Sequence, residues 1–425
     1  MKRHALQIDN HKNTIVYRKH GGGRDPLDEV IENLSSRRTA VILRPDFLRA
    51  DYIPQELPHR TEQIRALGRS LSPCLRGAKP SNIFVYGKTG TGKTAVCRYV
   101  FGRFGHEVAE RGELVRFSYV NCRLAGTEYR VLTEMCSAVG VSVPFTGLSK
   151  SEVFNRLTDS MGRLGISLIV CLDEIDVLVK SYGDNLLYEL TRGFMGSSWV
   201  TIVGISNDLM FKERLDPRVL SSLSEEELVF PPYTAAELAD ILRERVALAM
   251  RPGSVNAGVV GLCAALAAAE HGDARRALDL LRVSAEIAER SGSTTVGEIH
   301  VRQAQVAIER GRVQEVLSSL PLHSRLVVLA VMRAKGGGDG HIPSGSLYTT
   351  YRDLCNRIGV DPLTDRRVST LVSELDMLGL VSCDLISYGR HGRTRKTRLT
   401  IDPAEVKAIF RKDELLSSLL EELPS

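Results

Sequence analysis

The stretch GKTGTGKT at residues 87–94 restricts the fold of this chain more than any other part of the sequence. It fits the pattern G-x-x-x-x-G-K-[ST] and lies between an apolar run at 83–86 and a helix-like segment at 95–101. In that setting glycines let backbone N–H groups surround phosphate oxygens, Lys93 reaches the outer phosphates, and the Thr94 hydroxyl can bind magnesium. We therefore predict a phosphate-binding loop made of Gly87, Lys88, Thr89, Gly90, Thr91, Gly92, Lys93 and Thr94. An ordinary glycine-rich turn between a strand and a helix is the alternative.

Downstream of the loop, apolar runs alternate with longer amphipathic stretches. With the run before the loop, the strand-like segments lie at 83–86, 116–121, 166–172 and 200–205. Strands and helices in alternation predict a parallel sheet covered by helices on both faces. A chain of 425 residues, of which 43% are hydrophobic and 25% charged, is long enough for this sheet and for further domains.

The pattern changes after Pro231-Pro232, where the next ~80 residues show helical spacing and predict a small all-α domain. A further boundary is expected near residues 314–321. Beyond it we expect helices at 324–335, 344–358 and 365–378, and strands at 381–388 and 396–401. Three helices followed by a β-hairpin form the winged variant of the helix-turn-helix, a DNA-binding motif.

Two carboxylates follow the third apolar run. The apolar run at 166–172 is followed directly by Asp173 and Glu174, at the point where a buried strand should reach the edge of the sheet. Asp173 would hold magnesium through water, and Glu174 would orient and polarise an attacking water. Acidic residues after strands are also frequent N-caps of helices, which is the structural alternative.

Composition argues against several other classes of protein. The chain has 56 Lys and Arg against 51 Asp and Glu, a formal charge of +5 that by itself is too small to indicate nucleic-acid binding. The first 20 residues lack the apolar run of a signal peptide, and the small-residue stretch at 257–269 is too short to span a bilayer. Eight cysteines without a C-x-x-C pair argue against a zinc site or a disulfide framework.

Taken together, the motifs resemble those of the AAA+ ATPases of archaeal replication initiators, the origin-recognition and cell-division-control family. The resemblance covers residues 46–398. Besides the phosphate loop it rests on DEID at 173–176, GISND at 204–208, LDPRV at 215–219 and GDARRAL at 272–278. It implies an α/β AAA+ P-loop ATPase, with a parallel sheet and flanking helices, an α-helical lid and a C-terminal winged-helix domain. The implied boundaries are an N-terminal basic, flexible extension at 1–45, base at 46–232, lid at 233–313, winged helix at 314–412 and tail at 413–425.

The resemblance also implies roles around a bound nucleotide, ATP or ADP with Mg²⁺. Asn207 would sense the γ-phosphate, because an amide can hold a water or a phosphate oxygen without adding charge. A turn-forming Asn-Asp pair is the alternative there. Arg275 would reach from the lid to the phosphates, and the neighbouring Arg276 is the other candidate. The nucleotide is expected against Tyr52, Pro58 and Tyr233, with Tyr52 and Pro58 in the segment that frames adenine.

Arg218 resembles the arginine finger that completes the nucleotide site of a neighbouring subunit. Related ATPases carry an arginine in a Ser-Arg-Phe-like box, whereas this chain has Ser222 in that place. A surface ion pair of Arg218 with Glu213 or Asp216 is therefore the alternative.

Basic residues without any acid fill the turn of the expected hairpin. They are Arg390, Arg393, Arg395, Lys396 and Arg398. Arginine is favoured where a narrow minor groove concentrates negative potential, and a solvated charge run is the alternative. Arg366 and Arg367 begin the third helix, which reads DNA in such domains, and we expect Asp365 to cap it. The resemblance adds an insertion at 121–157, including Arg123, that also touches DNA.

The resemblance implies a replication initiator that binds double-stranded origin DNA and helps load the replicative helicase. Its ATPase would be slow and used as a switch, and it would act in the cytoplasm at the nucleoid, with no membrane partner. Other copies or paralogues bound to DNA are further expected partners. An AAA+ winged-helix transcription regulator or signalling ATPase is the alternative function, although residues 46–60 and 272–278 favour the initiator.

Overall fold

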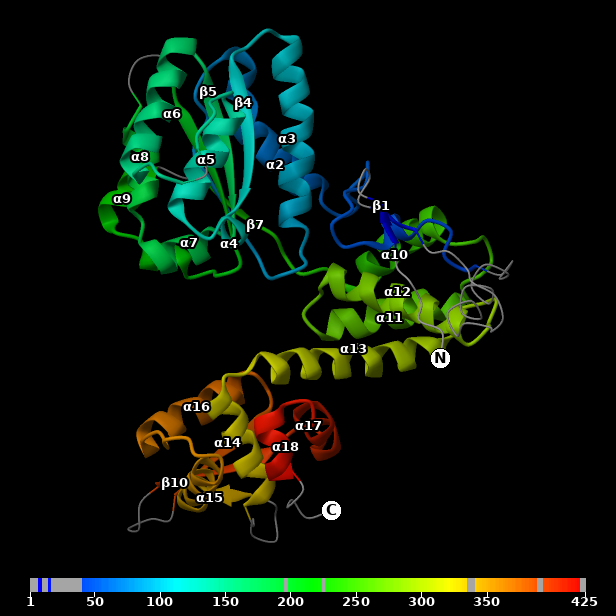
Figure 1. The fold of residues 1–425 in the computed structure, drawn as a ribbon. Helices are drawn as coiled ribbons and strands as arrows, with labels where there is room; N and C mark the ends of the chain where they lie inside the picture. Colours follow the sequence, from blue (N-terminus) through cyan, green and yellow to red (C-terminus); the bar gives the residue numbers. More distant parts are fainter. Residues whose placement is uncertain are drawn as a thin grey trace. The chain divides into compact units, whose positions relative to one another are not determined.

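The computed structural model describes residues 7–9, 14–16, 40–144, 146–194, 198–223, 226–334, 341–387 and 393–420. The chain divides into two compact units, Met1–Glu298 and Ile299–Ser425. The first unit contains the sheet and the helices after it, and the second contains a smaller sheet with its own helices (Figure 1).

The first unit is built on a five-stranded sheet in which every neighbouring pair is parallel, as predicted. The strands are β3 (Ile83–Tyr86), β4 (Val115–Asn121), β5 (Ser167–Asp173), β6 (Val200–Ser206) and β7 (Glu226–Val229). Their order is β4-β5-β6-β3-β7. Strand β7 was not predicted, because Glu226 and Glu227 are exposed on a short edge strand and give it no apolar run.

Helices cover both faces of this sheet (Figure 1). On one face lie α2 (Thr61–Leu71) and α3 (Lys93–Glu110), with the short helix η2 (Ser72–Arg76). On the other lie α5 (Glu128–Ala138), α6 (Lys150–Leu164), α7 (Ile175–Tyr182), α8 (Asn185–Arg192) and α9 (Pro217–Leu223), with the short helices α4 (Cys122–Ala125) and η3 (Phe211–Arg214). Alternate residues of β5 serve the two cores: Ile169 and Cys171 pack with α3, while Leu168 and Val170 pack with α5 and α6.

Three lid helices follow the sheet: α10 (Ala235–Ala249), α11 (Ala257–Ala269) and α12 (Ala274–Arg290). The chain before the sheet also contacts this lid, since Leu43 N donates to the carbonyl of Ala249 at 2.8 Å just before η1 (Pro45–Leu48). Two short strands nearer the N-terminus, β1 (Gln7–Asp9) and β2 (Thr14–Val16), pair antiparallel. The rest of the expected extension up to residue 39 lies outside the described residues.

Helix α13 (Glu298–Ser319) begins at the last residue of the first unit and ends at Ser319, within the range 314–321 where a boundary is expected. The second unit then has the helices and hairpin predicted for a winged helix. Its elements are α14 (Leu322–Arg333), β8 (Ile342–Pro343), α15 (Ser344–Arg357), α16 (Asp365–Met377), β9 (Val381–Ser387), β10 (Arg393–Leu399), α17 (Pro403–Phe410) and α18 (Glu414–Leu420).

Two details of the second unit differ from expectation. Strand β10 pairs with both β8 and β9, and it begins at Arg393 rather than at residue 396, so part of the basic run belongs to the strand and not to the turn. Residues 414–420, within the expected tail, form α18, and its Leu416 and Leu419 are buried in the winged-helix core. No helix in the described ranges is long and apolar enough to cross a membrane.

Candidate functional site

The loop between β3 and α3 has the backbone conformation of a phosphate-binding loop. Gly90 and Gly92 have φ angles of 74° and 86°, in the left-handed region that only glycine adopts without strain. A Cβ atom at Gly90 would also collide with the Asp273 carboxylate of the lid. Helix α3 begins at Lys93, so its free N-terminal N–H groups face the loop.

Lys93 joins the loop to a second strand of the sheet. The residue is only 5% exposed, and its ammonium donates to the carbonyls of Gly87 and Lys88 at 2.7 Å each and to Asn207 Oδ1 at 2.8 Å. Burial lowers the pKa of Lys93 to about 8, against the opposing attraction of Asp173. The structure therefore brings Lys93 and Asn207 together. The Asn207 side chain bonds this ammonium, which the turn alternative does not require.

Thr94 and Asp173 also meet. The Thr94 hydroxyl donates to Asp173 Oδ2 at 2.7 Å, and the Tyr119 hydroxyl on the neighbouring strand β4 donates to the same oxygen at 2.6 Å. The part of the chain that the structure describes has no cluster of three or more His, Cys, Asp or Glu that could hold a metal. The Thr94 hydroxyl and the Asp173 carboxylate are two oxygen donors in one cavity, a set that suits Mg²⁺, because this ion keeps several waters and phosphate oxygens as its other ligands.

Glu174 occupies the N-cap position of α7 but does not cap it. Its backbone has a left-handed φ of 54°, and its side chain makes no cap hydrogen bond. Instead, Arg123 Nε donates to Glu174 Oε2 at 2.5 Å and Asn121 Nδ2 to Oε1 at 3.4 Å. The carboxylate therefore lies at the end of β5 with polar partners from β4 and α4.

These side chains line one cavity of about 420 Å³ between the sheet and the lid. Tyr52, Pro58 and Tyr233 line it too, so the three residues expected at the nucleotide share the cavity. Tyr52 is held from the lid side, since Arg245 of α10 stacks 4.6 Å from its ring centroid. Gly87 and Lys88 do not line this cavity, and their backbone carbonyls accept hydrogen bonds from Lys93.

The lid places Arg275 and Arg276 differently. Arg275 is exposed and lines the cavity, whereas Arg276 forms an ion pair with Glu270, with Nε 2.9 Å from Oε2. The lid also contacts the loop directly, because Ala274 N donates to the carbonyl of Gly90 at 3.2 Å. Of the two arginines, Arg275 is the one positioned to reach a phosphate.

We expect Arg275→Ala to slow ATP hydrolysis by about tenfold or more while changing ADP affinity little, since one charge-assisted hydrogen bond to the outer phosphate is lost. Single-turnover phosphate release and ADP titration measure the two effects. Arg276→Ala is the matched control and should change neither. Equal losses in both measurements, or none, would remove Arg275 from the phosphate-sensing role.

Arg218 does not belong to the cavity of its own chain. It is exposed on α9, and the contact that the structure gives it is from its backbone N–H to Asp216 Oδ1 at 2.8 Å. No ion pair of its side chain with Glu213 or Asp216 occurs among the described residues, so the surface pair that was the alternative to the finger role is not formed.

The basic residues of the winged helix differ in exposure and in their contacts. Arg366, Arg367 and Arg398 are exposed, with Arg367 3.7 Å from Glu374, and Lys396 is half-buried. Arg395 donates to Ser373 Oγ of α16 at 2.7 Å. Arg393 lies in β10, but its side chain, like all of Arg390, is outside the described residues.

Helix α16 is capped one residue earlier than expected. Thr364 Oγ1 accepts from Arg367 N at 3.4 Å, whereas Asp365 is already the first helical residue. The prediction that Asp365 caps the helix is therefore wrong, because a threonine just before it has the extended backbone that a cap requires.

A phosphate loop on a parallel sheet, a strand ending in two carboxylates and a helical lid that faces the same cavity define an AAA+ P-loop ATPase, here followed by a winged helix. Comparison with known proteins gives the same domains. Residues 77–204 match an AAA domain, 239–306 the Cdc6 AAA+ ATPase-type lid domain, and 315–409 the CDC6 C-terminal winged helix domain.

Relatives over the whole chain identify the family. ORC1-type DNA replication protein 1 of Sulfurisphaera tokodaii is 47% identical over 396 residues, 92% of this chain and 98% of that protein. The ORC1-type DNA replication protein of Pyrococcus abyssi is 46% identical over 400 residues, 93% of this chain and 95% of that protein. The solved structure of Aeropyrum pernix ORC1 in complex with DNA is 48% identical, with a TM-score of 0.81, and covers 90% of this chain and 100% of that chain. The chain belongs to the ORC1-type family of DNA replication proteins, which confirms the predicted resemblance.

Sequence reasoning missed several residues that shape this site. Tyr119 and Arg123 contact the two carboxylates, Arg245 stacks on Tyr52, and Arg60 contacts the phosphate loop. Strands β4 and β5 pair with Tyr119 opposite Cys171 and Asn121 opposite Asp173. This pairing brings Tyr119 and Arg123 near the two carboxylates. No local pattern in the sequence specifies that pairing.

Proposed function

We propose that this protein is a replication initiator that binds ATP with Mg²⁺, binds double-stranded origin DNA and helps load the replicative helicase. The observation that carries the nucleotide part is Lys93, which contacts both the phosphate loop and Asn207 in a cavity that Arg275 of the lid also lines. One γ-phosphate there would touch the loop, the sheet and the lid, so ATP and ADP would hold the lid differently.

Thr94 and Asp173 would hold Mg²⁺ in this cavity, and the ion would neutralise charge on the phosphate oxygens. Glu174 would orient the attacking water. Each of its carboxylate oxygens already accepts from Arg123 or Asn121, which supports slow hydrolysis used as a switch, because a carboxylate in an ion pair is a weaker acceptor for water.

For DNA, support comes from the winged helix and from the Aeropyrum pernix relative, whose structure was solved in complex with DNA. Arg366 and Arg367 are exposed at the start of α16, and Arg398 is exposed on β10. A helix start and a wing that carry basic charge are the two parts of a winged helix that contact a duplex.

Arg218 supports a further kind of partner, namely other copies or paralogues of this protein. An exposed arginine outside its own nucleotide cavity is suited to the site of another copy or a paralogue on the same DNA, where it would stabilise developing phosphate charge.

A footprint on chromosomal DNA tests the initiator function directly. We expect protection at a replication origin, dependent on ATP. Protection at promoters with none at the origin would instead support the transcription regulator.

Replacing Arg366 and Arg398 together with alanine should flatten the dependence of log affinity on log salt by up to roughly 2 units, since each lost phosphate contact lowers the slope by about 0.9. Fluorescence anisotropy with an origin duplex at several salt concentrations measures the slope. The pair Arg411→Ala and Lys412→Ala, exposed at the end of α17, removes the same charge as a control. An unaltered slope in the first variant would show that this surface does not contact DNA.

A further inference from the structure

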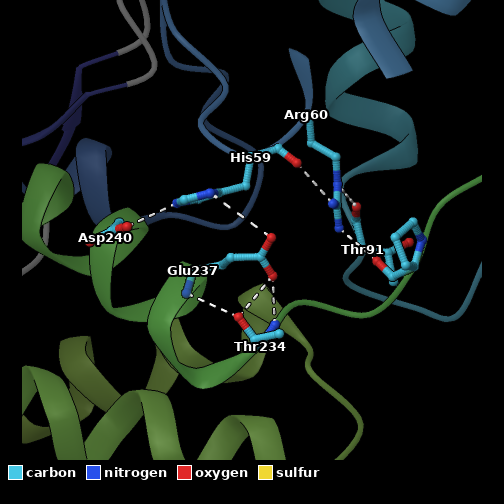
Figure 2. Close-up of polar contacts among 7 residues, drawn as sticks. His59, Arg60, Thr91, Thr234, Glu237 and Asp240 are labelled. Carbon is cyan, nitrogen blue, oxygen red and sulfur yellow. Dashed lines mark hydrogen bonds and ion pairs between the residues drawn. The ribbon is translucent and has the colours of Figure 1, made fainter. Parts of the chain in front are cut away.

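Arg60 lies between the phosphate loop and the start of the lid (Figure 2). It is 2% exposed, and its guanidinium donates to three backbone carbonyls from three segments. Nε donates to Thr91 O at 2.9 Å, Nη2 to Pro231 O at 2.7 Å and Nη1 to His59 O at 3.0 Å. Thr91 belongs to the phosphate loop, and Pro231 begins the linker that leads into α10. One side chain therefore fastens the loop to the linker.

The surroundings of Arg60 require a guanidinium and not merely a positive charge. Its plane stacks over the Tyr233 ring at 3.7 Å from the centroid, and the Phe230 ring is at 5.7 Å. No carboxylate forms an ion pair with it in the described ranges of the chain, and burial lowers the pKa of the group, although an arginine stays charged. Only a planar fork can donate in three directions while it stacks on a ring, so a lysine cannot replace it.

His59 extends the same connection to the lid helix α10 (Figure 2). Its Nε2 lies 3.0 Å from Asp240 Oδ2, and its Nδ1 lies 3.9 Å from Glu237 Oε1. Glu237 is also the acidic member of the capping box that starts α10, where its other oxygen accepts from Thr234 N at 2.8 Å. His59 has a left-handed φ of 61°, a conformation that costs a non-glycine residue energy and persists where contacts hold it.

We propose that His59 and Arg60 are positioning residues that couple the phosphate loop to the lid, in addition to any contact of Arg275 with a phosphate. The proposal rests on nucleotide binding in the cavity, as proposed above. Because Thr91 lines that cavity while its carbonyl is held by Arg60, a shift of the loop around a phosphate moves Arg60 and with it the Pro231 carbonyl. His59 carries the same shift to the first turn of α10 through Asp240 and Glu237.

Hydrogen–deuterium exchange of the full chain tests this coupling. The observable is the protection of peptides covering residues 231–237 with the β,γ-imido analogue of ATP, relative to ADP. We expect His59→Ala to reduce this ATP-specific protection about three- to tenfold, as the loss of one or two hydrogen bonds predicts, and to lower kcat for ATP more than it raises KM. His106→Ala on α3, an exposed histidine paired with Glu110, is the matched control and should behave as wild type.

Two conservative variants separate side-chain pairing from backbone strain. Asparagine tolerates the left-handed backbone but is too short to reach Asp240, whereas glutamine keeps a donor at a longer reach. His59→Gln should therefore restore the protection in large part, and His59→Asn should not. Equal behaviour of the two variants, or wild-type protection in His59→Ala, would overturn the proposal.

Arg60→Lys keeps the charge and removes the fork. In a protein that still melts cooperatively, it should lose the ATP-specific protection, and a wild-type response would overturn the proposal. Should this variant not fold, the His59 series decides the question. Titration of the wild type with the same nucleotide distinguishes a failure of the proposed function from a failure of the coupling. Absence of binding would contradict the proposed function. Binding with a protection that no His59 variant alters would contradict the coupling alone.

Discussion

Lys93→Ala is expected to weaken ATP binding by about 100-fold or more, the largest effect that a single substitution in this cavity should have. Charge-assisted hydrogen bonds contribute about 1.5–3 kcal/mol each, and the ammonium sits where the outer phosphates would lie. Its loss also leaves the carbonyls of Gly87 and Lys88 and the amide of Asn207 without the donor that they share. Isothermal titration calorimetry with ATP and Mg²⁺ measures the change.

Lys180→Ala, an exposed lysine of α7, removes the same charge outside the cavity and serves as the control. Thermal unfolding of both variants shows whether the fold is kept. Wild-type ATP affinity in a folded Lys93→Ala protein would reject the phosphate loop as the nucleotide site.

Glu174→Gln should bind ATP with near wild-type affinity and hydrolyse it about 100-fold more slowly or worse. Glutamine has nearly the same shape, so the loop and cavity stay intact, but it cannot accept a proton and polarises water poorly. Its amide also gives up the ion pair with Arg123, which is 67% exposed and therefore contributes little to stability. Single-turnover phosphate release, with affinity measured in parallel, separates binding from chemistry.

The control for this substitution is Glu152→Gln, a half-buried glutamate of α6 that pairs with Arg156 away from the cavity. Hydrolysis at the wild-type rate in Glu174→Gln would assign the water-orienting role to another group. A joint loss of affinity and rate would mean instead that the carboxylate holds the structure of the cavity.

Much of the fold follows from local patterns. Apolar residues follow one another in the four predicted strands, whereas they recur at helical spacing in the segments between them. Each element could therefore be located from its own sequence, without its neighbours. The sequence did not predict strand β7, because Glu226 and Glu227 are exposed at the edge of the sheet and leave no apolar run. The sequence also did not predict that β10 starts at Arg393, because pairing with β9, and not hydrophobicity, extends this strand into a basic run.

The candidate site divides in the same way. Lys93 and Thr94 belong to a motif whose backbone geometry is local, and Asp173 and Glu174 mark the end of a continuous apolar strand. Arg275 could not be separated from Arg276 by sequence, because only the packing of α12 turns one arginine into the cavity and the other toward Glu270. The roles of all these residues stay predictions until the variants are measured.

Local patterns in the sequence are sufficient to predict the class of protein, the order of its domains, and the residues of the phosphate loop and of the strand that ends in two carboxylates. Short-range rules suffice for these, since hydrophobic period, turn chemistry and a contiguous motif all act within a few residues. Arg60, His59 and Tyr119 reach their partners in the phosphate loop, the lid helix α10 and the strand β5 through the packing of distant segments. Their partners lie 31, 181 and 54 residues away along the chain, and a hydrogen bond over such separations depends on how strands and helices pack, which no local pattern encodes.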